Sequence, residues 1–153
     1  MIIGVKCSNF YSIGDDVFMD YTVGNHAPKT HLFKTLDVAG YSKRISLVNT
    51  IIGPNASGKT SLLTILDFLK HMIVDSLNDP ADIGMFNYTP NERHNNDPSY
   101  VSVKFSIDKR IFEYILKFDR LRIIQEKIVE YKLATKRFSA TTLFYRFWNK
   151  KNQ

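Results

Sequence analysis

The first apolar segments of the chain have the length and residue types of β-strands. Residues 2–10 are rich in β-branched and aromatic side chains, and residues 16–21 place Val17, Met19 and Tyr21 on alternate positions. Alternation with a period of two is typical of a strand with one buried face. Residues 24–44 are mixed in character and contain glycine and proline, so we expect a connection there that could include a short helix.

A continuous apolar run and an amphipathic helix follow this connection. Residues 45–52 read ISLVNTII, which predicts a buried central strand of a sheet. Between residues 58 and 76 the apolar positions recur at helical spacing: Leu62, Ile65, Leu66, Leu69, Met72 and Ile73. Such a stripe predicts an amphipathic helix that docks on the sheet.

The second half of the chain predicts a loop and then an antiparallel β meander. Residues 77–99 are rich in Asn, Asp and Pro, which favour irregular structure. Three apolar segments separated by short polar turns follow, namely VSVKFSI, IFEYILKF and LRIIQEKIVEYKL, and TTLFYRF is a fourth candidate strand. We therefore expect one domain with strands, a glycine-rich loop and a helix in 1–76, a loop in 77–99, the meander in 100–147 and a polar tail in 148–153.

Composition limits the class of protein. The chain has 153 residues, of which 44% are hydrophobic and 24% charged, and this is typical of one globular domain with a core. A single cysteine, Cys7, excludes an internal disulfide framework. No apolar stretch approaches the ~18 residues of a membrane span, and no signal sequence is evident, so we expect a cytoplasmic protein without membrane contact.

The positive charge is concentrated in the second half. The formal net charge is +6, but residues 101–153 alone carry 13 Lys and Arg against five acidic residues. This excess suggests contact with DNA or RNA through 101–153, and the aromatic residues among these cations would suit a platform for single strands. The alternation of Phe112, Tyr114, Leu116 and Phe118 along one strand is equally typical of a buried core face.

The motif with clear chemistry lies between the predicted central strand and the predicted helix. Its residues fit G-x-x-x-x-G-K-[ST] without exception: Gly53, Pro54, Asn55, Ala56, Ser57, Gly58, Lys59 and Thr60. Glycines let backbone N–H groups point at phosphate oxygens, and the following helix adds its N-terminal dipole. Lys59 would contact the β- and γ-phosphates, and the Thr60 hydroxyl would ligate Mg²⁺. The alternative is a glycine-rich turn with an exposed lysine.

Other candidate sites are weaker. His26 and His31 are five residues apart in a predicted loop, which does not favour a metal site. Residues 114–119 resemble an apolar strand that ends in a Mg²⁺-binding carboxylate at Asp119. Lys117 interrupts this strand and no second acid follows, so a strand end with a turn explains the segment better.

The segment GPNASGKTSLL, residues 53–63, resembles the phosphate loop of ABC-type ATPases of the OLD-like, abortive-infection group. These AAA-domain ATP-binding proteins are distantly similar to the DNA-repair and SMC-type ATPases. The turn at 8–13, the order of elements and the meander in IDKRIFEYILKFDRLRIIQEKIVEYKL also match, so the resemblance covers residues 1 to about 147. It implies an α/β P-loop NTPase fold, the N-terminal lobe of an ABC-ATPase head, with a mixed sheet and an antiparallel β meander.

The resemblance also implies ligands. ATP and Mg²⁺ would bind at residues 53–60 together with Ser61, and Thr60 would be the metal ligand. The turn after the first strand would contact the adenine and ribose through Asn9, Phe10, Tyr11 and Ser12, although Phe10 could equally be a core residue. The signature loop, the Walker B Asp-Glu pair and the switch histidine of such ATPases are absent, and Gln125 is a poor candidate for the Q-loop because it lies in a predicted strand.

The expected function follows from this partial motif set. The chain resembles the N-terminal half of an ATPase in a phage-defence or DNA-maintenance system, a half that binds ATP but does not turn it over. Its partners would be the remaining half or a second copy in a dimer of heads, and an effector nuclease or toxin. The alternatives are a basic nucleic-acid-binding domain with a regulatory nucleotide site, or a truncated homologue that modulates a full-length ATPase. The meander after the helix disfavours a small-molecule kinase.

Overall fold

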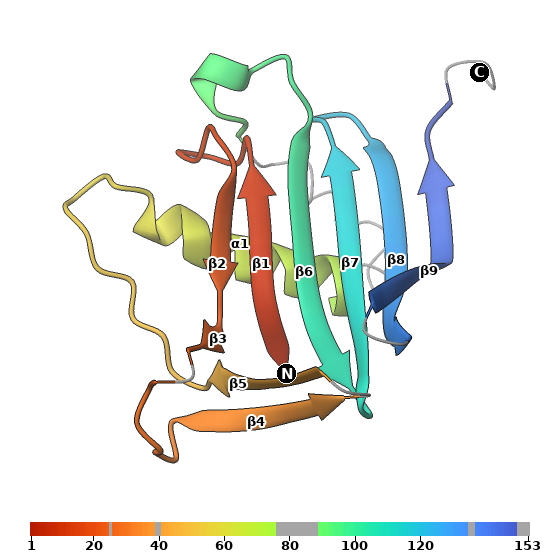
Figure 1. The fold of residues 1–153 in the computed structure, drawn as a ribbon. Coiled ribbons are helices and arrows are strands. Elements are labelled where there is room, and N and C mark those ends of the chain that lie inside the picture. Colours follow the sequence, from red (N-terminus) through yellow and green to blue (C-terminus); the bar gives the residue numbers. More distant parts are fainter. Residues whose placement is uncertain (25, 39–40, 76–88, 135–136, 150–153) are drawn as a thin grey trace.

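The computed structural model describes residues 1–24, 26–38, 41–75, 89–134 and 137–149. Its largest element is a six-stranded sheet (Figure 1). The strand order is β2 (Val17–Asp20), β1 (Ile2–Ser8), β6 (Ser99–Ile107), β7 (Arg110–Phe118), β8 (Ile123–Ala134) and β9 (Arg137–Phe147). Every strand pair in the described residues is antiparallel, so the expected mixed sheet is not formed there.

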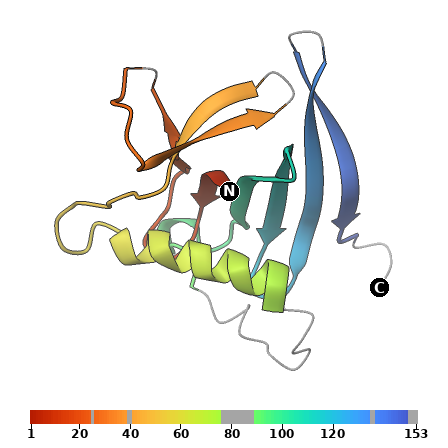
Figure 2. The same cartoon turned by 90° about the horizontal axis from the view of Figure 1, so that it is seen from below.

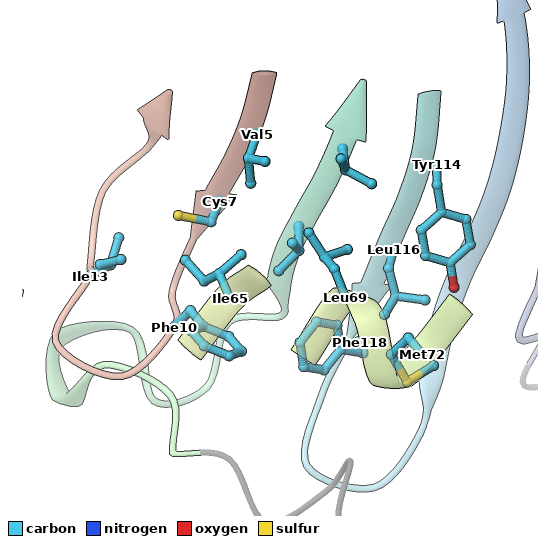
Figure 3. Close-up of a cluster of buried hydrophobic side chains, with 12 residues drawn as sticks. Val5, Cys7, Phe10, Ile13, Ile65, Leu69, Met72, Tyr114, Leu116 and Phe118 are labelled. Carbon is cyan, nitrogen blue, oxygen red and sulfur yellow. The ribbon is translucent and has the colours of Figure 1, made fainter. Parts of the chain in front are cut away.

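The helix predicted between residues 58 and 76 is confirmed. Helix α1 (Lys59–Lys70) continues into a short π-helix, η1 (His71–Asp75). It lies across one face of the six-stranded sheet (Figure 2). Ile65, Leu69 and Met72 are its buried side chains, and Figure 3 shows them against the apolar residues of β1 and β7. The apolar stripe therefore has the role that its spacing predicts.

The meander is also confirmed. Strands β6 to β9 follow one another in the chain and in the sheet, each antiparallel to the next. Tyr114, Leu116 and Phe118 are buried against α1, and Phe112 is half-buried and stacks on Phe105 with ring centroids 5.8 Å apart. This face of β7 is core, as its alternation suggested. Of the predicted loop at 77–99, residues 77–88 lie outside the described part, Glu92–His94 form a short 3-10 helix, η3, and Ser99 already belongs to β6.

The prediction of a connection over residues 24–44 is wrong. A second, three-stranded sheet is built there in the order β3 (Thr22–Val23), β5 (Tyr41–Ser46) and β4 (Phe33–Val38). Figure 1 shows it at one end of the larger sheet. Leu36 and Val38 alternate with polar neighbours and pack on Ile111 of β7. The strands are short and contain several charged residues, so the sequence shows little apolar periodicity over this segment.

The prediction of a buried central strand at residues 45–52 is also wrong. Only Ile45 and Ser46 belong to a strand, and Ile45 is fully buried. Residues 47–52 form no strand and expose four large apolar side chains, Leu47, Val48, Ile51 and Ile52. An apolar run forms a buried strand only if neighbouring strands cover it, and no described strand lies beside this one. No helix in the described residues is long and apolar enough to cross a membrane.

Candidate functional site

The glycine-rich loop at residues 53–60 joins the exposed apolar segment to the start of α1. Gly58 is the N-cap of the helix and has a φ of 89°, in the left-handed region that favours glycine. A Cβ at this position would lie 3.2 Å from Ser12 Oγ, and a Cβ at Gly53 would lie 2.7 Å from Ser57 Oγ. A larger residue at either position would crowd a serine hydroxyl, so glycine lets the loop approach these side chains closely. A loop of this kind can direct its backbone N–H groups at phosphate oxygens.

Lys59 folds back over this loop. Its Nζ donates hydrogen bonds to the carbonyl oxygens of Gly53, at 2.9 Å, and Pro54, at 2.5 Å. The side chain is neither paired with a carboxylate in these contacts nor extended into solvent. The loop therefore holds a positive charge at its own centre, where it can move to an incoming anion.

The start of α1 is open to an anion as well. The first N–H groups of a helix have no partner within the helix, and here no side chain caps them. The first turn also has no acidic residue that would compete for these groups. Leu62 N–H bonds to the Gly58 carbonyl at 3.0 Å and so marks the beginning of the regular helix.

Ser12 and Ser61 connect the turn after β1 to the start of α1. Their Oγ atoms are 2.7 Å apart, although the two residues are 49 positions apart in the sequence. Both residues were candidates from the sequence, but no local pattern indicates that they touch. Of the turn residues, Ser12 is the one that the structure brings to the phosphate loop.

The side chains of Asn9 and Phe10 serve the fold. Phe10 is 1% exposed and packs on Phe68 of α1, with ring centroids 5.4 Å apart. The Asn9 side chain is buried and makes three hydrogen bonds to the backbone of residues 91–97. Tyr11 is half-buried and packs edge-on against Phe10. These residues hold the turn that presents Ser12.

No protein metal centre accompanies the loop in the described residues. They contain no group of three or more His, Cys, Asp or Glu side chains that could hold a metal ion. Thr60 is exposed at the first turn of α1, where its hydroxyl is accessible. His31 lines an open hollow of about 850 Å³ on the small sheet, away from the phosphate loop, and His26 is exposed outside it.

Two further side chains with possible chemistry have structural roles. Asp119 Oδ1 accepts hydrogen bonds from the N–H groups of Leu121 and Arg122, at 2.7 and 2.9 Å, as expected for a turn after a strand. Cys7 is buried beneath α1, and burial together with the nearby Asp16 raises the pKa of its thiol to about 11. A thiol with this pKa is unreactive at neutral pH.

Comparison with known proteins agrees with this geometry. Residues 48–151 match the model of the family described as "AAA domain, putative AbiEii toxin, Type IV TA system". No curated protein and no solved structure matches the chain. The match covers more than half of the 153 residues and includes the whole glycine-rich loop and the meander. The chain therefore belongs to this AAA-domain family and is a P-loop ATPase-like, nucleotide-binding module.

Proposed function

We propose that the chain is the Mg-ATP-binding lobe of an ABC-type ATPase of the OLD-like group. The observation that carries this proposal is the position of Lys59, whose ammonium lies on the carbonyls of its own loop at the uncapped start of α1. An anion with several oxygens would satisfy the helix N–H groups and the lysine together. A triphosphate fits this set of donors.

Each residue of the loop has a distinct role in this proposal. The backbone of residues 53–58 and the N–H groups at the start of α1 surround the phosphate oxygens, and Lys59 neutralises the β- and γ-phosphates. Thr60 supplies a hydroxyl ligand to Mg²⁺, which neutralises phosphate charge when it is bound. Ser61 lies beside Ser12, and this pair marks the side of the loop where the rest of the nucleotide would extend.

The turn at residues 9–12 would contact the adenine and ribose. Ser12 and Tyr11 have accessible surface for this contact, whereas Asn9 and Phe10 act by fixing the shape of the turn. Asn9 and Tyr11 both have positive φ values, 52° and 51°, and the buried contacts of the turn hold them there. These contacts define the backbone conformation in which the turn would present Ser12 and Tyr11 to a nucleotide.

The module is incomplete for hydrolysis. The sequence has no apolar strand that ends in Asp-Glu and no signature loop, and these would supply the base and the transition-state donors. We therefore expect this chain to bind Mg-ATP and to turn it over negligibly. A complementing lobe, either the remaining half of the ATPase or a second copy, would provide the missing groups.

A large exposed apolar surface supports a complementing lobe. Leu47, Val48, Ile52 and Leu63 are each more than half exposed. Leu47 and Leu63 also line a hollow of about 540 Å³, whose other walls are mainly apolar residues from β1, β2, α1 and the segment before the phosphate loop. Contiguous apolar surface of this kind marks an interaction site. ATP binding next to this surface would control dimerisation of heads, and through it an effector nuclease or toxin in phage defence or DNA maintenance.

Substitution of Lys59 tests the proposal. We expect Lys59→Ala to weaken binding of a fluorescent ATP analogue by about ten-fold or more, because a charge-assisted hydrogen bond contributes roughly 1.5–3 kcal/mol. Lys70→Ala is the matched control, since Lys70 is exposed at the other end of α1. Chelation of Mg²⁺ should also weaken binding.

Two outcomes would contradict the proposal. The first is equal nucleotide binding by Lys59→Ala and the unchanged chain, which would leave the loop as a structural turn. The second is phosphate release by this chain alone at ordinary ATPase rates, lost in Lys59→Ala, which would show that no complementing lobe is needed.

A further inference from the structure

The face of the six-stranded sheet opposite α1 is not covered by a helix in the described residues. Figure 2 shows α1 on one side, with the small sheet and the β8–β9 hairpin extending to the other. Tyr114 and Leu116 of β7 are buried beneath α1, so Ile115 and Lys117 between them point to the open face. The strand registers then assign the other residues of this face.

Two rows of side chains cross the open face. In one row, consecutive strand partners are Phe147, Gln125, Lys117 and Tyr100. In the next row they are Tyr145, Lys127, Ile115, Ser102 and Lys6. Neighbouring strands lie about 4.8 Å apart, so each row places aromatic and lysine side chains within reach of one extended ligand. We call these nine residues the aromatic–lysine face.

The aromatic end of this face is exposed. Tyr145 and Phe147 lie on the edge strand β9 and are 52% and 59% exposed. Their rings stack on each other with centroids 5.7 Å apart and an angle of 28° between the planes. Both rings therefore stand on the same side of the strand, and neither contributes to the buried core. Aromatic rings arranged in this way offer a surface on which flat, planar groups can stack.

In the part of the chain that the structure describes, the two central lysines of the face form no ion pair. On the α1 side of the same strands, Glu126 pairs with Arg146 and Glu130 pairs with both Arg110 and Lys132. On the open side, no ion pair joins Lys117 or Lys127 to any carboxylate in the described residues.

Glu113, an acid on the open side, is already engaged. Its two oxygens accept hydrogen bonds from the hydroxyls of Ser102, at 3.0 Å, and Tyr131, at 2.5 Å. Lys6 lies over the ring of Phe18, with its Nζ 5.4 Å from the centroid. Among the described residues, ion pairs therefore neutralise Glu126 and Glu130 on the α1 side, whereas none involves Lys117 or Lys127 on the open side.

We propose that the aromatic–lysine face binds single-stranded nucleic acid. Bases stack on Tyr145 and Phe147, and the lysines, Lys117 and Lys127 first, contact the phosphates. A single strand fits because its bases are free to stack, whereas a duplex buries the faces of its bases. The polyanion matches the charge of the face, and stacking requires no particular base sequence. The face lies on the opposite side of the sheet from α1, so its ligand is separate from the nucleotide at the phosphate loop.

Fluorescence anisotropy with labelled dT12 and rU12, in the absence of any nucleoside triphosphate, tests the inference. We expect binding by the full chain that weakens steeply with salt. Tyr145→Ala combined with Phe147→Ala should weaken binding by about five-fold or more, because the variant removes both rings on which bases would stack. Lys117→Gln with Lys127→Gln should weaken binding and also flatten its salt dependence.

The matched controls lie on the other side of the sheet, one of them on the same strand as Tyr145 and Phe147. Phe144→Ala removes an exposed aromatic of β9 that lines a hollow beside Met72 and Ile73 of η1, and Lys70→Gln removes a lysine of α1. Both should bind dT12 as the unchanged chain does, and thermal unfolding should show that all variants fold.

Three results would overturn the inference: no binding of dT12 or rU12 at low salt, equal or tighter binding of a duplex, or loss of binding in Phe144→Ala as large as in the Tyr145 and Phe147 variant. Since ATP is absent from the assay, failure of the nucleotide proposal would not affect its result.

Discussion

Glu130 is a buried carboxylate that two cations neutralise. Its Oε1 accepts a hydrogen bond from Arg110 Nε at 2.7 Å, and Lys132 Nζ lies 3.4 Å from Oε2. The hydrogen bond from Arg110, reinforced by the charges of Arg110 and Lys132, holds the pKa of Glu130 below its usual value of 4.5. The three residues join β7 to β8 at the base of the β8–β9 hairpin.

Substitution of Glu130 should therefore have a pH-dependent effect on stability. A lowered pKa in the folded state means that the ionised carboxylate stabilises the fold above about pH 4.5, and that this contribution is lost as the pH falls through the lowered value. We expect Glu130→Gln to have a lower urea midpoint than the unchanged chain at pH 7, and the difference to shrink towards pH 3. Glu92→Gln, at an exposed position, is the control. A difference that stayed constant between pH 7 and pH 3 would contradict the assigned pKa.

Single residues also show where sequence reasoning stops. The roles of Lys59 and Gly58 could be predicted because the motif is contiguous. The hydrogen bonds of the Asn9 side chain could not be predicted, because its partners lie between 82 and 88 positions away in the chain. The same holds for Ser12 and Ser61, which the fold of the turn brings together.

Among the elements, the helix and strands predicted from regular apolar spacing are confirmed by the structure. Helix α1 and strands β6, β7 and β8 each pack one face in the same core, so the spacing of their apolar residues matches their surroundings. Strand β9 pairs with β8 at the edge of the sheet and is exposed from residue 139 to 147. The segment at residues 45–52 differs because most of its apolar side chains lie on the surface, where no described residue covers them. Its apolar composition therefore does not indicate a buried strand. Ile45 at its start is fully buried in the small sheet, whereas Ile52 at its end is 89% exposed.

This contrast can be measured with two identical substitutions. We expect Ile45→Ala to lower the free energy of unfolding by about 2–5 kcal/mol, because it leaves a cavity in the core shared with Leu36 and Ile111. Ile52→Ala should change it by less than about 0.5 kcal/mol, as exposed substitutions usually do. Urea unfolding of both variants checks the pair. Equal losses at the two positions would show that residues 47–52 are buried in solution, as a central strand or between two copies.

At the scale of the whole molecule, the six-stranded sheet separates two surfaces. One side carries α1, which begins at the phosphate loop (Figure 2). The strand registers place the aromatic–lysine face on the other side. Strand alternation divides the cations of the meander between the two sides: Arg110, Lys132 and Arg146 pair with carboxylates on the α1 side, whereas Lys117 and Lys127 stand on the open face. A complementing lobe on the α1 side would leave the open face accessible.

The exposed apolar surface on the α1 side predicts binding of an apolar dye. We expect the chain to increase the fluorescence of anilinonaphthalene sulfonate, and the combined Ile52→Gln and Leu63→Gln variant to reduce this increase, because these side chains are 89% and 58% exposed. The free energy of unfolding should be nearly unchanged, since neither side chain is buried. Leu121→Gln is the control, because Leu121 is 76% exposed in the turn between β7 and β8. Undiminished fluorescence in the double variant would place the apolar surface elsewhere and would remove the main support for a complementing lobe on this side of the sheet.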